Sequence, residues 1–310
     1  MVEMTDHSNF EDSEPNGIAV AEEMPRDKGK VDHEELKKSG YIFQRDAEYF
    51  TVRLRIPGGT LSSDQIAVIG EIARKYGRGT VHLTIRQGVE IPWVSFVKLG
   101  EVTKALDKVG TPPGSCGPRV RNITACVGLP TCTHANIDSQ ALVKRLDERF
   151  FDVVLPTKLK IAVAGCPNSC SNPWINDIGI IGCIKPGVVP EKCNGCGACV
   201  RVCKESAVEI TNGTPRIDSA KCLYCGECTR ACMTGAITVE KEGYSILIGG
   251  NTGRHPRFAY RLVDFADEET LFRVIENCIR LLKEEGKRGE RFSRLIERLG
   301  LVEAIKKRLL

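Results

Sequence analysis

The sequence predicts an α+β protein built from several small units, and three observations support this class. Residues 49–109 alternate between strand-like and helix-like patterns in the order β-α-β-β-α. Four cysteines in two short loops follow between residues 126 and 170, with further strand and helix patterns around them. Eight more cysteines form a duplicated run over residues 193–232. The length of 310 residues suits one large domain or two to three small ones.

Charge is distributed unevenly along the chain. Residues 1–35 carry eleven acidic and three basic side chains, a net charge of −8, whereas the whole chain carries +4. We therefore expect an acidic, mobile tail over residues 1–38, followed by a basic remainder that suits anionic ligands. No recognised nucleic-acid motif accompanies the basic charge, so we expect no nucleic-acid partner.

The cysteine content indicates redox or metal chemistry in a reducing cytoplasm. The chain has 15 cysteines but no apolar segment of secretory type at its start, so disulfides are not expected. No apolar run approaches the length of a membrane span, and the mean hydropathy is −0.17. We expect a cytoplasmic protein with no membrane partner.

The first unit is predicted to be a ferredoxin-like half-domain over residues 39–111. Strand patterns alternate apolar and polar residues, and helix patterns repeat apolar residues every three to four positions. The order of these elements is the basis for the ferredoxin-like topology. The predicted strands and helices cover residues 49–56, 62–76, 80–86, 89–94 and 97–109.

The second unit is predicted to combine residues 112–185 with residues 239–310. The duplicated cysteine run lies between these two segments, so residues 186–238 are expected to form an inserted domain. The predicted elements of the second unit cover residues 139–150, 158–163, 177–181, 243–250, 268–284, 288–299 and 301–309.

The four cysteines of the second unit are candidate ligands of an iron–sulfur cluster. Cys126 and Cys132 form a C-x5-C pair, and Cys166 and Cys170 form a C-x3-C pair. Soft thiolates select iron–sulfur centres or zinc over hard cations. The loops are rich in Gly, Pro, Asn and Ser, as expected where backbone N–H groups must turn toward cluster sulfurs.

The inserted domain carries the pattern C-x2-C-x2-C-x3-C twice, at an offset of 29 residues. Zinc knuckles would leave two cysteines of each run without a role. The pattern resembles the bacterial two-cluster ferredoxins, although Lys204 and Met233 stand where those proteins have proline. In such modules the fourth cysteine of each run binds the other cluster. The resemblance implies one set of Cys193, Cys196, Cys199 and Cys232 and another of Cys222, Cys225, Cys228 and Cys203.

The two cysteine pairs of the second unit resemble the signature of the sirohaem sulfite and nitrite reductases. That resemblance implies a 4Fe–4S cluster on these four cysteines, with Cys170 also bound to the sirohaem iron. With its inserted ferredoxin, the chain resembles the catalytic subunit of anaerobic sulfite reductases, and also the dissimilatory and small archaeal-type members of the family. Three 4Fe–4S clusters and one sirohaem are therefore expected.

The resemblance extends to charged residues outside the cysteine loops. The segment Val52-Arg-Leu-Arg-Ile-Pro-Gly-Gly59 implies that Arg55 contacts the substrate anion, and Arg121 matches a second substrate arginine. Lys158 and Lys160 match a lysine pair on the strand before the second cysteine pair. Period-2 spacing puts both lysines on one strand face, where a solvated strand edge is the alternative interpretation. The segment Thr84-Ile-Arg-Gln-Gly88 implies that Arg86 and Gln87 lie at the sirohaem macrocycle.

The expected reaction is the six-electron reduction of sulfite to sulfide, with electrons supplied through the inserted domain by a donor protein or subunit. Reduction of nitrite to ammonia is the alternative reaction, since both anions suit the same cations. A second alternative is an iron–sulfur electron-transfer subunit without a working haem site. Full-length family members enclose the cofactor with two related halves, and this chain has one. We therefore expect a homo-oligomer or a complex with reductase subunits.

Overall fold

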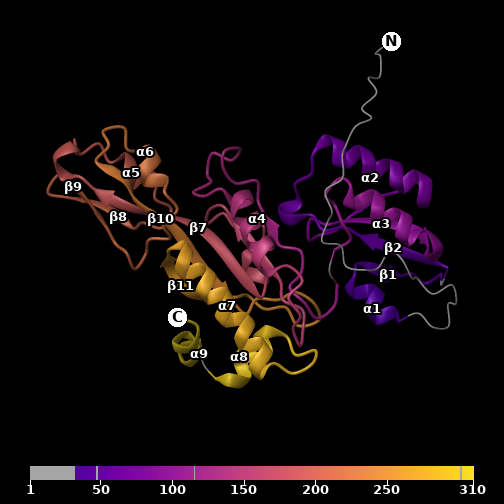
Figure 1. The fold of residues 1–310 in the computed structure, drawn as a ribbon. Coiled ribbons are helices and arrows are strands. Elements are labelled where there is room, and N and C mark those ends of the chain that lie inside the picture. The colour runs from indigo at the N-terminus through magenta and orange to yellow at the C-terminus, as the bar shows by residue number, and fades with distance from the viewer. Residues whose placement is uncertain (1–31, 47, 115, 301) are drawn as a thin grey trace, which may run out of the picture.

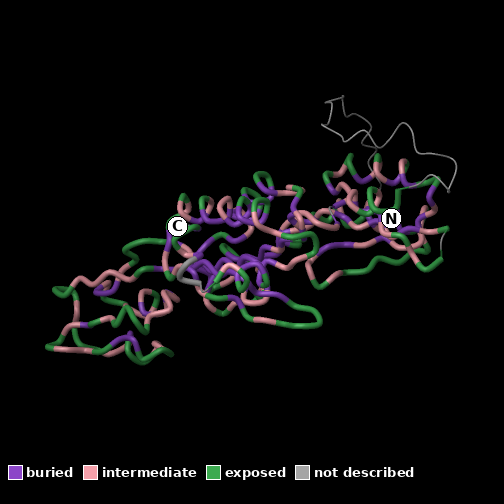
Figure 2. Tube along the Cα trace, turned by 90° about the horizontal axis from the view of Figure 1, so that it is seen from below, coloured by how far each residue is buried: buried purple, intermediate pink, exposed green. Residues whose placement is uncertain are grey.

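The computed structural model confirms the α+β class and shows three units arranged in an elongated molecule (Figures 1 and 2). It describes residues 32–310 except 47, 115 and 301, so most of the predicted acidic tail lies outside the described residues. Residues 33–38, assigned above to that tail, form helix α1 (His33–Lys38), which begins after the capping side chain of Asp32. No helix in the described part of the chain is long and apolar enough to cross a membrane.

The N-terminal unit packs two helices on a four-stranded antiparallel sheet of order β1-β2-β4-β3. Its strands are β1 (Tyr41–Phe43), β2 (Tyr49–Arg53), β3 (His82–Leu83) and β4 (Val89–Ser95), and its helices are α2 (Ser63–Tyr76) and α3 (Leu99–Asp107). Helix α2 begins with a capping box between Ser62 and Gln65. Alternating burial along β2, with Phe50 and Val52 inside, agrees with the predicted strand.

The predicted strand over residues 80–86 is wrong except at His82 and Leu83. Only His82 and Leu83 pair with β4, and the chain then turns. The Gln87 amide donates to the Thr84 carbonyl at 3.0 Å, and Gln87 has a φ of 57°. The left-handed conformation of Gln87 and the hydrogen bond to Thr84 form a tight turn here, which ends the strand. The turn directs Arg86 and Gln87 at the central unit instead of alternating them across a sheet.

The central unit is built on a five-stranded mixed sheet of order β11-β10-β7-β6-β5. Its strands are β5 (Thr124–Ala125), β6 (Ile161–Ala164), β7 (Ile178–Val188), β10 (Ile237–Ile248) and β11 (Tyr260–Ala266), and its helices are α4 (Ser139–Phe150), α7 (Glu268–Glu285), α8 (Phe292–Leu299) and α9 (Val302–Leu309). Strands β5, β6 and β7 are parallel, whereas β10 and β11 are antiparallel to their neighbours. The cysteine loops follow β5 and β6, so both leave the sheet at the same edge.

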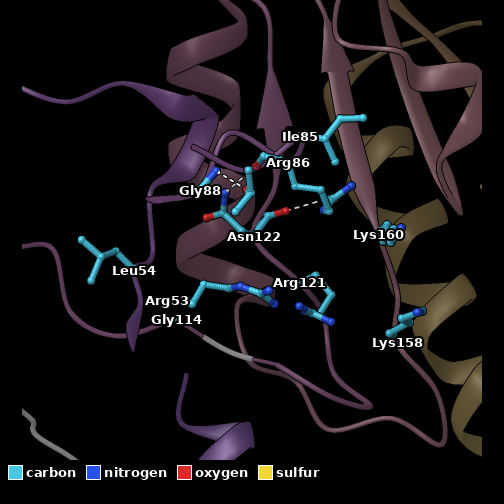
Figure 3. Close-up of a pocket in the computed structure, with 11 residues that line it drawn as sticks. Arg53, Leu54, Ile85, Arg86, Gly88, Gly114, Arg121, Asn122, Lys158 and Lys160 are labelled. Atoms are coloured by element: carbon cyan, nitrogen blue, oxygen red, sulfur yellow. Dashed lines mark hydrogen bonds between the residues drawn. The ribbon is translucent and has the colours of Figure 1, made fainter. Parts of the chain in front are cut away.

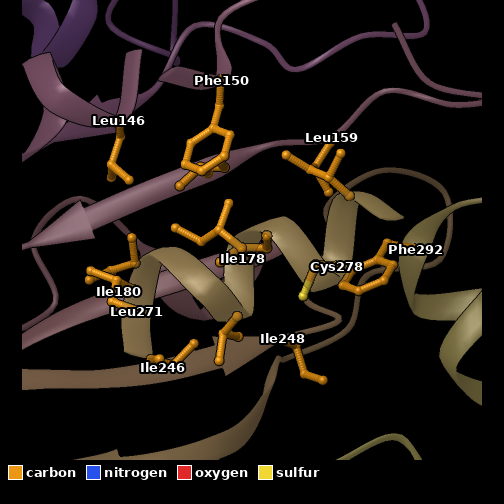
Figure 4. Close-up of a cluster of buried hydrophobic side chains, with 14 of the residues drawn as sticks. Leu146, Phe150, Leu159, Ile178, Ile180, Ile246, Ile248, Leu271, Cys278 and Phe292 are labelled. Atoms are coloured by element: carbon orange, nitrogen blue, oxygen red, sulfur yellow. The ribbon is translucent and has the colours of Figure 1, made fainter. Parts of the chain in front are cut away.

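The main hydrophobic core joins the central sheet to α4, α7 and α8 (Figure 4). Ile178 and Ile180 of β7 face Leu271 and Cys278 of α7 in this cluster. Phe292, at the start of α8, is completely buried against it. The apolar periodicity of residues 268–284 therefore reports the core-facing side of α7.

Replacing Phe292 with alanine is expected to lower the free energy of unfolding by about 3–5 kcal/mol, since it leaves a cavity in this core. Urea denaturation of the purified protein measures the change. Phe258 provides the matched control because it is 76% exposed, and its replacement by alanine is expected to change stability by less than about 0.5 kcal/mol. Equal effects of the two substitutions would contradict the assignment of Phe292 to the core.

A small unit projects from the far ends of β7 and β10 (Figure 1). These two strands pair from Ile178 with Ile248 to Val188 with Ile237, and the projecting unit occupies the chain between their ends. It contains two short helices and a two-stranded sheet: α5 (Ala198–Val202), α6 (Glu227–Ala231), β8 (Val208–Thr211) and β9 (Thr214–Ile217). Its small core consists of four cysteines and four aliphatic side chains. A unit this small has little apolar surface of its own to bury.

Candidate functional site

A cavity of about 330 Å³ lies where the N-terminal unit meets the central unit (Figure 3). Five basic residues line it, and none of its lining residues is acidic. They come from β2, from the turn before β4, from the segment before β5 and from the segment before β6. These cations are Arg53, Arg86, Arg121, Lys158 and Lys160. Concentrated positive charge without carboxylates favours a small anion or a ligand with several carboxylates.

Arg86 is the most deeply buried cation of this cavity. Its guanidinium donates to the Asn176 side chain at 2.7 Å and to the Asn122 carbonyl at 2.6 Å. Burial, together with the like charges of Arg121 and Arg291, lowers the Arg86 pKa to about 10. The Arg86 Nε is buried and has no hydrogen-bond partner. An unpaired charged donor at this depth costs free energy, so the site suits an anionic acceptor.

Lys158 and Lys160 both reach the cavity, as the period-2 spacing requires (Figure 3). Burial and the charges of Arg86 and Arg291 lower the Lys160 pKa to about 8. Burial also lowers the Lys158 pKa, with further contributions from Arg291 and Arg121. An ammonium group with a pKa near neutrality can both hold an anion and release a proton.

Asp177 is the acidic residue whose charge acts on both lysines. It is completely buried, and it accepts hydrogen bonds from the Lys160 amide at 2.9 Å and from Arg291 at 2.7 and 2.8 Å. Its charge favours the protonated form of Lys160, opposing Arg86 and Arg291. Asp177 thus holds the start of β7 beside the segment of Lys158 and Lys160. Through Arg291 it also connects the start of β7 to the segment before α8.

Arg53 and Arg121 meet at one wall of the cavity. Arg53 pairs with Glu90 at 2.6 Å, and its Nη1 lies 2.8 Å from the Cys116 sulfur. The Nη2 of Arg121 lies 3.4 Å from the same sulfur. Burial lowers the Arg121 pKa; the Cys116 thiol opposes this effect and Arg53 adds to it. The shared contact with Cys116 holds both guanidinium groups at the cavity edge.

Arg55, expected above to contact the substrate, does not line this cavity. Its Nε donates to the Asp147 carboxylate of α4 at 2.8 Å, and its guanidinium lies 3.7 Å from the ring centroid of Phe151. Arg53, two residues earlier, lines the cavity instead of Arg55. The sequence pattern could not choose between the two arginines, because both precede the same turn and alternation puts both on one face. The family resemblance pointed to Arg55.

A second cavity of about 420 Å³ adjoins the turn that carries Arg86. Gln87 lines it and ties the turn to the first cysteine loop: Gln87 donates to the Ala125 carbonyl at 2.6 Å and accepts from the Ala125 amide at 2.8 Å. Adjacent residues of one turn therefore line the two cavities, Arg86 the cationic one and Gln87 the other. The four cysteines expected to hold a cluster all line the second cavity: Cys126, Cys132, Cys166 and Cys170.

The four thiols of this cavity form one electrostatic group. Burial raises the Cys166 pKa, and the charges of Cys126, Cys132 and Cys170 raise it further. The Gly165 amide donates to the Cys126 sulfur at 3.0 Å, and a side chain at position 165 would meet that sulfur at 3.3 Å. Glycine therefore lets backbone donors approach the sulfur atoms, as a cluster site requires.

The eight cysteines of the projecting unit fall into two groups in space. Cys203 lines a pocket with Cys222, Cys225 and Cys228. On the other side, the charges of Cys193 and Cys232 act on the Cys199 thiol. Each group thus includes the fourth cysteine of the other run. Amides donate to the sulfurs in both groups, as for Ala207 to Cys203 at 3.3 Å and Ile237 to Cys232 at 3.2 Å.

In the described part of the chain, no three His, Cys, Asp or Glu side chains lie within reach of one metal ion. A cubane cluster binds each thiolate through a different iron atom, so its four sulfurs stand farther apart than zinc ligands do.

Several residues that shape the site were not expected from the sequence. Arg53, Asn122, Asp177 and Arg291 carry no motif of their own. Asn122 donates to the Ile56 carbonyl at 2.8 Å and accepts from the Ile56 amide at 3.1 Å, which anchors the segment after Arg121 to the N-terminal unit. The position of Asn122 directly after Arg121 could have indicated a role at the site. No sequence pattern near Asp177 or Arg291 indicated that these two residues form an ion pair.

The fold and the site define the class of protein: an iron–sulfur oxidoreductase with a cationic pocket beside a thiol-lined cavity. The chain belongs to the nitrite and sulfite reductase family, which confirms the resemblance drawn from its motifs. Residues 116–308 match the nitrite and sulphite reductase 4Fe-4S domain, and residues 42–109 match the nitrite/sulfite reductase ferredoxin-like half domain. It is thus an oxidoreductase of the sulfite reductase type.

Relatives in two organisms support this membership. A coenzyme F420-dependent sulfite reductase of Methanocaldococcus jannaschii is 42% identical over 210 residues, covering 67% of this chain and 34% of that protein. One of the subunits of the anaerobic sulfite reductase of Salmonella typhimurium is 34% identical over 252 residues, covering 75% of this chain and 74% of that protein. The chain therefore spans about a third of the first relative and most of the second.

The fold is shared with solved structures. The chain superposes on dissimilatory sulfite reductase I with a TM-score of 0.68 at 21% identity, covering 84% of this chain and 71% of that one. The NirA protein of Mycobacterium tuberculosis gives a TM-score of 0.65 at 18% identity, covering 92% of this chain and 48% of that one.

Proposed function

We propose that the protein is a sirohaem sulfite reductase that reduces sulfite to sulfide. The observation that carries the proposal is the placement of five cations, with no acidic residue in the cavity lining, directly beside a cavity lined by four thiols. Relatives named as sulfite reductases support the choice of sulfite. Nitrite is the second candidate, because a nitrite reductase of Haloferax mediterranei is 28% identical over 289 residues and the same cations suit both anions.

The residues present fit a sirohaem group at the cationic cavity. Sirohaem carries many carboxylates, and the buried Arg86 Nε has no partner in the protein. Ile85 lines the same cavity with a side chain that is 97% exposed, an apolar surface suited to a macrocycle face. Arg86 would bind a carboxylate of the group, and Cys170 would bind its iron together with the adjacent cluster.

In this proposal the haem iron supplies the coordination site at which sulfite receives electrons. The protein residues supply charge and protons. Arg53 and Arg121 hold sulfite oxygens with two planar donor groups that stay charged. Lys158 and Lys160 add positive charge and donate protons from Nζ, since burial lowers both of their pKa values. The reaction consumes six electrons and six protons, so a donor that can be reprotonated at neutral pH is useful.

The thiol groups complete the proposed electron route. Cys126, Cys132, Cys166 and Cys170 would hold the cluster beside the haem, and the eight cysteines of the projecting unit would hold two more. The projecting unit would accept electrons from a donor protein or subunit in the cytoplasm. A second copy of the chain, or a reductase subunit, would complete the enclosure that the single half-domain leaves open.

An anaerobic preparation tests this proposal. The expected protein contains about thirteen iron atoms per chain, shows sirohaem absorption bands, and oxidises reduced methyl viologen with sulfite. Turnover with nitrite alone would replace sulfite with the second candidate. Broad iron–sulfur absorption without haem bands or turnover would favour an electron-transfer subunit and contradict the proposal.

Arg53, at the end of β2, and Arg55, two residues later, are expected to give different phenotypes when each is replaced. Replacing Arg53 with glutamine removes a cation from the cavity and should raise the KM for sulfite by about tenfold. Replacing Arg55 with glutamine leaves the buried Asp147 unpaired and should lower the free energy of unfolding by about 3 kcal/mol. Steady-state kinetics and urea denaturation of both variants measure the split. A larger KM effect from Arg55 would return the substrate role to that residue.

A further inference from the structure

The two cysteine runs of the projecting unit are copies with the same local structure. Residues 29 positions apart are equivalent, so Arg201 corresponds to Arg230. Each of these arginines donates to the carbonyl of the second cysteine in its run, Arg201 to Cys196 at 2.8 Å and Arg230 to Cys225 at 2.8 Å. Any difference in role between the copies must therefore come from residues that the duplication does not share, or from the neighbours that each copy contacts.

Two residues of the second copy that the first copy does not share, Tyr224 and Glu227, contact the central unit. Tyr224 stands where the first copy has Gly195. Its carbonyl accepts from the Ile184 amide at 2.8 Å, and its ring lies 5.5 Å from that of Phe265. A side chain at Gly195 would meet nothing within 4 Å. Tyr224 therefore packs against strands β7 and β11, whereas the equivalent position of the first copy faces open space.

Position 227 shows the same contrast. Glu227 stands where the first copy has Ala198. Its carboxylate lies 3.1 Å from the His134 Nδ1 and 3.1 Å from the Arg230 Nη2. His134 belongs to the loop that begins at Cys132. The second copy therefore presents an acidic side chain to the first cysteine loop of the central unit, and the first copy presents a methyl group.

Asn136 joins these contacts at the centre of the interface. Its side chain is 2% exposed, and its Nδ2 donates to the Gly182 carbonyl at 3.0 Å and to the Tyr224 carbonyl at 3.4 Å. Its Oδ1 accepts from the Arg230 Nη1 at 3.0 Å. Its own amide donates to the carbonyl of Gly165, the residue before Cys166. One buried side chain thus links a cysteine loop of the central unit to the second copy.

We infer that the two cysteine groups of the projecting unit have fixed and different roles. The group of Cys203, Cys222, Cys225 and Cys228 is the inner one, held beside the central cysteine loops by the joint of Asn136 and Arg230. The group of Cys193, Cys196, Cys199 and Cys232 is the outer one, where the electron donor binds. Two exposed residues agree with this: Cys196 is on the surface, and Met233, directly after Cys232, is 94% exposed.

This inference rests on the proposed clusters and assigns their order. A one-electron carrier protein, or reduced methyl viologen in an experiment, would be oxidised as it gives one electron to a cluster held by the outer group. That electron would pass to a cluster held by the inner group and on to the central one, so that each transfer oxidises one cluster and reduces the next. Asn136 and Arg230 are positioning residues, since neither touches a substrate or supplies a ligand.

The test uses the anaerobic holoprotein with Asn136→Ala, Arg230→Gln and the matched control Arg201→Gln. The control removes the same contact to a cysteine carbonyl but leaves the joint intact. Electron paramagnetic resonance of the dithionite-reduced protein measures the spin coupling between the inner and central clusters. Rapid mixing with reduced methyl viologen measures the rate at which the central cluster is reduced.

Both joint variants are expected to keep their iron, to lose most of the spin coupling and to reduce the central cluster about tenfold more slowly. Arg201→Gln should keep the wild-type coupling. Equal changes in Arg201→Gln and Arg230→Gln, or no change in either joint variant, would overturn the assignment. If Asn136→Ala does not fold, Arg230→Gln decides the result alone. A wild-type protein without three clusters would instead overturn the proposed function, so the two failures are distinguishable.

Discussion

Replacing Cys170 with alanine is expected to abolish sulfite reduction, lowering turnover by more than about 100-fold. Cys170 lines the thiol cavity and is exposed, so the substitution removes a proposed ligand with little loss of packing. The central cluster would lose a thiolate and the haem iron its protein ligand. Iron analysis should show about eight atoms per chain in place of about thirteen, with the haem bands lost.

Cys278 is the matched control for this substitution. It is completely buried in the main core, and burial raises its pKa, as expected for an inert thiol. Replacing Cys278 with alanine is expected to lower the free energy of unfolding by about 1 kcal/mol while iron content and haem bands stay unchanged. Full iron and undiminished turnover in the Cys170 variant would refute its role as a ligand.

Replacing Lys160 with methionine is expected to lower the kcat for sulfite by about 100-fold and to change the pH profile. The Lys160 pKa is lowered to about 8, so its ammonium form is present below that pH and is lost above it. Proton donation should therefore fail on the alkaline side, with the wild-type kcat falling about tenfold per pH unit above about pH 8. The groups that act on this lysine are Arg86, Arg291, Asp177 and Lys158.

Replacing Lys160 with arginine separates charge from proton donation. Arginine keeps the positive charge but does not release a proton in this pH range, so KM should stay near the wild-type value while kcat falls. An alkaline limb that is present in the wild type and absent in both variants belongs to Lys160 and not to the ionisation of sulfite. A limb that persists unchanged in both variants would contradict the assignment.

The cysteine spacing carried most of the predictive content. Short loops bring nearby cysteines together whatever the rest of the chain does, and the structure places each C-x5-C and C-x3-C pair in one cavity. The lysine pair was predictable for a similar reason, because alternation along an extended segment puts Lys158 and Lys160 on one face. Local geometry decided both features.

The roles of Arg53 and Arg55 could not be predicted from local spacing. Alternation puts Arg53 and Arg55 on the same face of the extended segment, but it does not say which one a distant helix neutralises. Asp147 of α4 binds Arg55, which leaves Arg53 for the cavity. Likewise, the turn at Gln87 ends the predicted strand. Gln87 makes one hydrogen bond to Thr84 and two to Ala125 in place of hydrogen bonds to a neighbouring strand. Both outcomes depend on partners far away in the sequence.

The sequence by itself determined the family, the α+β class, the three groups of cysteines and the cationic character of the site. These features depend on residue type and on short spacings, which survive any packing of the units. Only the tertiary structure decided which arginine lines the pocket, how Asp177 and Arg291 set the charge around Lys160, and which copy of the duplicated run meets the central unit. Those outcomes depend on burial and on contacts between distant segments, and the free energies of both are set only when the units pack together.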